Sequence, residues 1–157
     1  MRHSLAFTLI AVAAVTGCKK EGTPASDTPA TAAAGRSSAA RPARTAAVTI
    51  TSPADGATTG RDVTVRLHAE GVTIAKSDGA KVEGVGHYHL FLDTMPTPNG
   101  TVIPPTTKQV VHIGSGDSTF TFKGLTPGQH RIIAVIGYGD HSAMPGTRDT
   151  VNVVVKP

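Results

Sequence analysis

The feature that most constrains the fold of this chain is a series of short segments in which apolar and polar residues alternate. In one of them, Val63, Val65 and Leu67 alternate with polar side chains. Residues two apart share one face of a strand, so this alternation is typical of strands with one dry face. Turn residues such as Gly, Pro and Asp interrupt the pattern after roughly every ten residues, as in all-β domains. From residue 47 onward the sequence therefore predicts strands and no long helix.

These segments predict an all-β fold of about seven short antiparallel strands, with no helix connecting one strand to the next. Eight segments are candidates, at 47–51, 63–68, 72–75, 86–93, 108–113, 118–123, 131–136 and 150–155, and 72–75 is the weakest of them. Such a set favours an immunoglobulin-like antiparallel β-sandwich, and a small barrel is the alternative. We expect the strands at 108–113 and 118–123 to pair as a hairpin across residues 114–117.

The N-terminus has the pattern of an export signal. A positive start is followed by an apolar stretch at 5–15 that is too short to span a bilayer, and then by Val15-Thr16-Gly17-Cys18. This last motif resembles a bacterial lipoprotein cleavage site, which implies removal of residues 1–17, lipidation of Cys18 and anchoring in a membrane. Lys19, where Asp would indicate inner-membrane retention, favours an outer membrane and a periplasm-facing domain. An ordinary secretory signal is the alternative.

Residues 18–46 are rich in Ala, Ser, Thr and Pro and lack branched aliphatic side chains. Such a segment cannot bury enough apolar surface to fold, so we expect a disordered tether between the lipidated Cys18 and a domain at 47–157. Cys18 is the only cysteine. The domain must therefore be stable without a disulfide.

The net charge of +4 does not indicate nucleic-acid binding, because the excess of basic residues precedes the domain. From residue 47 to the end, nine Lys and Arg residues balance nine Asp and Glu residues. The chain also has no Trp. A basic face and an aromatic stacking surface are both missing from the sequence, so nucleic acid is excluded as a partner.

Two histidines in one predicted strand carry the clearest chemical signal. His87 and His89 are two residues apart and therefore share a face, which places two imidazoles within reach of one ion. Tyr88, Leu90 and Leu92 point to the other face and are expected in the core. Histidines at strand ends also serve as plain hydrogen-bonding residues, which is the structural alternative.

Further residues complete a candidate metal site. His112 lies in another predicted strand and His141 in the loop before the last strand. Imidazole suits copper and zinc, and a nearby thioether would add a preference for Cu(I), so copper is favoured. The possible additional ligands are Met95, Met144, Asp93 and Asp140. His68 falls on a wet face, and His130, after a Pro-Gly corner, is expected to bond a backbone carbonyl.

Several motifs together resemble a bacterial exported domain of unknown function, DUF4399. They are the segments at 53–57, 86–90 with Asp93, 112–114, 127–130 and 139–141 with Pro145. The resemblance spans most of residues 48–155 and implies an immunoglobulin-like fold in an exported protein. It implies no activity.

The sequence offers no support for catalysis. Ser115 and Ser118 lack the surroundings of a nucleophile elbow, and no Gly-rich loop opens a helix. We therefore expect a non-enzymatic binding lipoprotein that holds a transition metal through histidines. The alternative is an accessory module that docks an envelope protein or a glycan. A metal site requires the histidines to converge, whereas a docking module predicts dispersed histidines and an exposed apolar patch.

Overall fold

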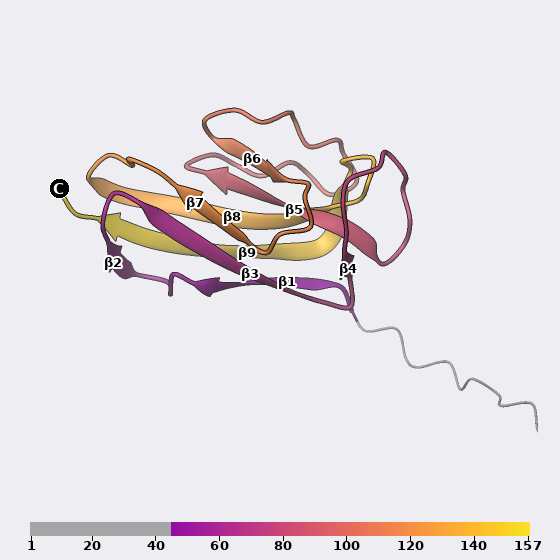
Figure 1. The fold of residues 1–157 in the computed structure, drawn as a ribbon, viewed down its shortest axis with the longest axis horizontal. Coiled ribbons are helices and arrows are strands. Elements are labelled where there is room, and N and C mark those ends of the chain that lie inside the picture. The colour runs from indigo at the N-terminus through magenta and orange to yellow at the C-terminus, as the bar shows by residue number, and fades with distance from the viewer. Residues whose placement is uncertain (1–44) are drawn as a thin grey trace, which may run out of the picture. The chain divides into compact units, whose positions relative to one another are not determined.

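The computed structural model describes residues 45–157, which form nine strands and no helix (Figure 1). The strands are β1 Ala47–Ser52, β2 Ala57–Thr59, β3 Val63–Glu70, β4 Thr73–Ile74, β5 Val85–Leu92, β6 Val110–Ile113, β7 Thr119–Phe122, β8 Gly128–Gly137 and β9 Ala143–Val155. Among these residues no helix is long and apolar enough to cross a membrane. The predicted signal sequence, Cys18 and nearly all of the predicted tether lie outside the described residues.

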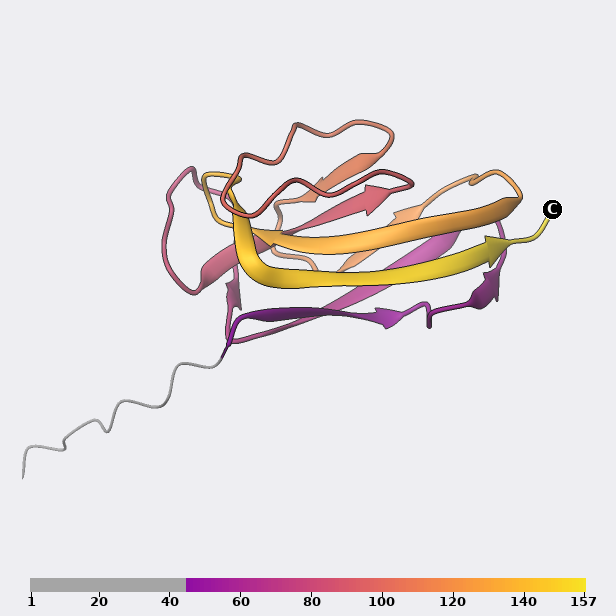
Figure 2. The same cartoon turned by 180° about the vertical axis from the view of Figure 1, so that it is seen from behind.

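The strands form two facing sheets, a small one ordered β1-β3-β7 and a large one ordered β2-β9-β8-β5-β4, in which β6 also pairs with β5 (Figures 1 and 2). The arrangement β1-β3-β7 against β9-β8-β5-β6 is that of an immunoglobulin-like sandwich. This confirms the predicted fold class. Strand β4 confirms the weak candidate at 72–75 in shortened form, and β2 is the one strand that was not predicted. Both make short parallel pairings, β4 with β5 and β2 with β9.

The main core lies between the sheets and confirms the predicted faces of β5. Tyr88, Leu90 and Leu92 pack in it with apolar residues of β3 and β8, and Leu90 is fully buried. The residues of β5 that alternate with them therefore point to the outer face of the large sheet.

A second apolar cluster buries this outer face as well. Residues 94–107, between β5 and β6, fold back over the sheet (Figures 1 and 2). Their Ile103 belongs to a cluster with side chains of four strands, β5, β6, β8 and β9. The full cluster is Phe91, Ile103, Val110, Ile133, Val135 and Ala143. The amides of Ile103 and Ala143 donate to the carbonyls of His141 and Thr101, which fixes the connection to the start of β9. Strand β5 is consequently buried on both faces.

The predicted hairpin of the strands near 110 and 120 is wrong. Strand β6 pairs with β5 in the large sheet, whereas β7 pairs with β3 in the small one, so residues 114–117 cross between the sheets. Three of the four residues of β6 are buried, as a strand covered on both faces requires, while β7 is half exposed. Alternation and turn residues identify such strands but not their partners.

The last strand starts earlier than predicted, at Ala143 instead of Thr150. It contains Pro145 and Gly146, which disfavour strand. Strand β2 pairs only with Val153 and the residues after it, so the first part of β9 has β8 as its one strand neighbour. This part of β9 is therefore an edge of the sheet, where Pro is tolerated. A register shift opposite Val135 and Gly137 accommodates the irregularity.

Candidate metal centre

Strand β5 presents His87 and His89 on the outer face of the large sheet, at the end covered by residues 94–107. Both side chains are fully buried. His89 lies opposite His112 of β6 on one side and opposite Val135 of β8 on the other, and His87 lies opposite Gly137. The candidate site is thus built on the centre of the sheet, where the backbone is held on both sides.

His112 reaches the site because it is the cross-strand partner of His89. Residues directly opposite each other in an antiparallel pair have Cβ atoms about 5 Å apart and point to the same face. The two imidazoles stack with their centroids 5.1 Å apart and their planes inclined by 17°. Gly114, two residues later, lies under the ring, since a Cβ atom there would overlap the imidazole of His112.

His141 comes from the tight turn between β8 and β9. Its φ of 65° is in the left-handed region, which His enters more readily than most residues. Its amide donates to the carbonyl of Tyr138 at 2.8 Å, and its carbonyl accepts from Ile103 at 2.8 Å. Asp140 supports the turn by accepting from the amide of Ser142 at 2.9 Å and from its hydroxyl at 2.6 Å. The unusual backbone conformation is therefore fixed from several sides.

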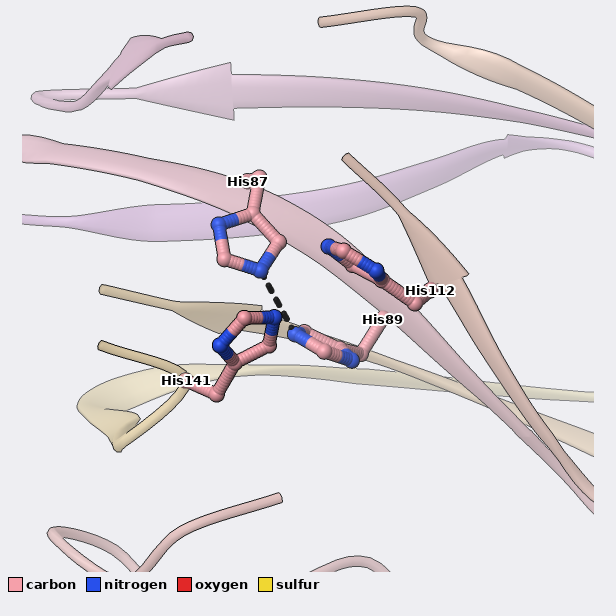
Figure 3. Close-up of side chains that lie close together, drawn as sticks. All are labelled: His87, His89, His112 and His141. Carbon is pink, nitrogen blue, oxygen red and sulfur yellow. Dashed lines mark hydrogen bonds between the residues drawn. The ribbon is translucent and has the colours of Figure 1, made fainter. Parts of the chain in front are cut away.

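The four imidazoles converge on one point, as Figure 3 shows. Each ring offers one nitrogen, and these four nitrogens lie within 4.8 Å of one another. Nε2 of His87 and Nε2 of His89 are only 2.9 Å apart, so one of them carries a proton that the other accepts. Nitrogens of a tetrahedral metal site are about 3.3 Å apart, given metal–nitrogen distances of about 2.0–2.1 Å. The group is therefore the right size for one ion.

Gly137 makes this packing feasible. It occupies the same row as His87, and a Cβ atom on it would lie 3.0 Å from both Cδ2 and Nε2 of His89 and 3.3 Å from Ile103. The missing side chain leaves space for the ring of His89. Sequence analysis missed this residue, although a glycine inside a strand is a signal of close approach.

Burial favours the neutral form of His87, His89 and His112 and leaves a ring nitrogen of each without a partner. Burial first, and then the nearby His112 and His141, lower the pKa of His87 to about 4. Burial and the other three histidines lower the pKa of His89 to about 2. The pKa of His112 is also lowered, first by burial and then by His141. Nδ1 of His87, Nδ1 of His89 and Nε2 of His112 are buried without a hydrogen-bond partner. Buried polar atoms of this kind are rare, and neutral imidazole is the form that binds metals.

The other predicted ligands lie elsewhere. Met95 is 72% exposed, and its sulfur lies 3.7 Å from the guanidinium of Arg131, near the opposite end of β8. Met144 packs in the main core, on the other face of the sheet from the histidines. Asp93 binds His130, and Asp140 caps its own turn, so neither carboxylate belongs to the cluster. The structure thus brings together only the nitrogen ligands of the predicted set.

The two remaining described histidines behave as expected. His68 is exposed, on the wet face of β3. His130 bonds the carbonyl of Thr126 through Nε2 at 2.8 Å, which confirms its predicted structural contact. Its Nδ1 lies 2.6 Å from a carboxylate oxygen of Asp93.

The match to a known family covers the sandwich from β3 onward and all four histidines. Residues 65–156, more than half of the chain, match the domain of unknown function DUF4399. The chain belongs to the DUF4399 family. This confirms the family indicated by the sequence motifs, and it places the cluster within the DUF4399 domain.

Comparison with solved structures adds similarities of fold only. This DUF4399 protein is 15% identical to the fibronectin(III)-like modules of Clostridium thermocellum CbhA, with a TM-score of 0.43 over 69% of this chain and 95% of that one. It is 12% identical to the extracellular domain of the putative one-component system BT4673 of B. thetaiotaomicron, with a TM-score of 0.43 over 66% of this chain and 12% of that one. No curated protein matches the chain.

Proposed function

We propose that this DUF4399 protein is a non-catalytic binding protein of the bacterial envelope that holds one transition-metal ion through His87, His89, His112 and His141. The observation that carries the proposal is the convergence of four nitrogens within 4.8 Å of one another. Four of the six histidines in residues 45–157 take part, although they come from three separate stretches of the chain. Neutral imidazoles cluster in this way at metal sites, where the ion satisfies their lone pairs.

Copper is the ion that we favour, as Cu(II). The cluster contains only imidazole nitrogens, because Met95 and Met144 lie elsewhere, so the structure gives no thioether support for Cu(I). Among divalent ions, affinity for a given nitrogen site generally rises to Cu²⁺ and falls again at Zn²⁺. Zinc is therefore the second candidate, and availability in the compartment decides between the two.

The proposed location rests on the sequence. Cys18 and the export signal before it support a lipid anchor in the outer membrane, with the domain facing the periplasm on a tether. Metal loading of an exported domain would then occur outside the cytoplasm.

The alternative, a docking module, finds no specific support. A docking module requires an exposed apolar patch. The large exposed apolar residues within 45–157 instead come from separate segments: Val82, Met95, Val102 and Val154. Converging histidines also favour the metal site over a module with dispersed ones.

The proposal is tested by calorimetric titration of the purified protein with Cu(II), Cu(I) and Zn(II). We expect one ion per chain with micromolar or tighter affinity. The double variant His87→Ala/His89→Ala should lose binding while circular dichroism shows an intact β fold, and His68→Ala, at an exposed histidine, should bind normally. Binding no tighter than that of the double variant would contradict a metal function.

A further inference from the structure

The segment 75–80, between β4 and β5, runs past three of the four histidines, and we refer to it as the strap. Its amides donate to carbonyls next to the candidate ligands. Ala75 donates to Gly86 at 2.9 Å, Ser77 to Gly114 at 3.3 Å and Gly79 to Gly139 at 3.1 Å. Gly86 precedes His87, Gly114 follows His112 by two residues, and Gly139 precedes His141 by two. The strap thus links the segments that carry the site.

Ser77 is the strap residue that reaches the site itself. It is half-buried, and its hydroxyl lies 3.5 Å from Nε2 of His141. Figures 1 and 2 show the β4–β5 connection beside the turn between β8 and β9 from both sides. At Gly139 a Cβ atom would overlap the backbone of Ala80, so the strap is seated closely on that turn.

The strap also lies on the side from which an ion must enter. His87 and His89 are fully buried, whereas His112 and His141 are half-buried. An ion coming from solvent therefore meets the second pair first. Ser77 contacts one of these histidines and the segment beside the other.

The contacts made by Ser77 are longer than those made by Ala75 and Gly79 of the same strap. The two contacts made by Ser77, at 3.3 and 3.5 Å, are near the long limit for a hydrogen bond. Residues 78–80 are exposed and contribute no apolar side chain to the core. Segments with few buried contacts open at much lower free energy than core strands.

We propose that the strap gates the histidine cluster and that Ser77 is a positioning residue, which holds His141 in place. This inference rests on the proposed function and specifies how ion exchange at the same site is controlled. A bound ion fixes His112 and His141, and the strap contacts next to both then persist for longer.

Limited trypsin digestion of the full-length protein tests the gate, with Cu(II) or Zn(II) alone as the probe. Lys76 and Lys81 are exposed and flank the strap, while the exposed Lys108 and Lys123 lie elsewhere and serve as internal controls. We expect a bound ion to slow cleavage after Lys76 and Lys81 at least fivefold, and to leave cleavage at the control lysines unchanged. Equal rates with and without ion, or equal slowing at all four lysines, would overturn the gate.

A second measurement separates positioning from general stability. Ser77→Ala should speed ion release to a chelator several-fold while leaving the absorption spectrum of the Cu(II) complex and the urea midpoint unchanged. Ser118→Ala, at an exposed serine outside the strap, is the matched control and should release the ion at the normal rate. An unchanged release rate for Ser77→Ala would remove its assigned role. Calorimetry on the same samples shows whether an ion binds at all, so failure of the proposed function is distinguished from failure of the gate.

Discussion

Gly137 has no side chain at the point where the imidazole of His89 lies, on the outer face of the large sheet. A Cβ atom on Gly137 would lie 3.0 Å from two atoms of that ring, which is fully buried. The site therefore depends on a residue that offers no ligand. Its neighbour across the strands, His87, is a proposed ligand.

The substitution Gly137→Ala should damage both the site and the fold. Overpacking of a buried site costs about 1–3 kcal/mol, so we expect a loss of that size in the free energy of unfolding, measured with urea. Displacement of the His89 ring should also raise the Kd for Cu(II) at least tenfold by calorimetry. Gly60→Ala is the matched control, because a Cβ atom there meets nothing within 4 Å. Equal behaviour of the two variants would refute the crowding.

Without metal, the domain should lose stability as the pH falls. The folded-state pKa of His87 is lowered to about 4 by burial and by the nearby His112 and His141, and that of His89 to about 2, against 6.5 for a free imidazole. The unfolded chain therefore binds protons first, which favours unfolding below pH 6.5. The urea concentration at the unfolding midpoint should be highest at pH 7.5, lower at pH 6 and lower again at pH 5. In His89→Leu the decline should be shallower, and an identical slope would show that the cluster is not its source.

His130 should contribute the opposite pH dependence. Both ring nitrogens face acceptors, at 2.6 Å in Asp93 and 2.8 Å in Thr126, which requires both to be protonated. Burial opposes protonation, but the hydrogen bonds to Thr126 and Asp93 raise the pKa of His130 above its ordinary value. Its stabilisation is complete below pH 6.5 and is lost as the pH rises through the raised pKa. In an NMR titration His130 should titrate above 6.5, and in Asp93→Asn its pKa should fall. A normal pKa in the unmodified protein would refute the imidazolium.

Replacement of Cys18 tests the proposed anchor. Cys18→Ser should abolish labelling with radioactive palmitate and release the protein from the membrane fraction, because the proposed anchor consists of the acyl chains attached to Cys18. Variants at the histidines, such as His87→Ala, should remain membrane-bound. Labelling that persists in Cys18→Ser would place the lipid elsewhere or show that no lipoprotein signal operates.

Much of the site could be predicted because strand geometry is local. Alternation in residues 86–93 places His87 and His89 on one face and Tyr88 and Leu90 on the other, and the structure has both pairs as expected. The all-β class follows from the same local pattern, repeated along the chain. Strand geometry alone therefore predicts the correct face for each of these residues, without knowledge of its neighbours.

The neighbours themselves were decided only by tertiary structure. The pairing of β6 with β5 places His112 opposite His89, whereas the local pattern favoured a hairpin with β7. Met95 and Met144, near the histidines in sequence, point to a different end and a different face of the sheet. The physical reason is that alternation fixes the face of a strand, while its partner and register depend on which distant apolar surfaces it buries. The sequence by itself thus determined the fold class and the common face of His87 and His89. The packing of the sheets and of residues 94–107 determined that the imidazoles of His112 and His141 meet theirs.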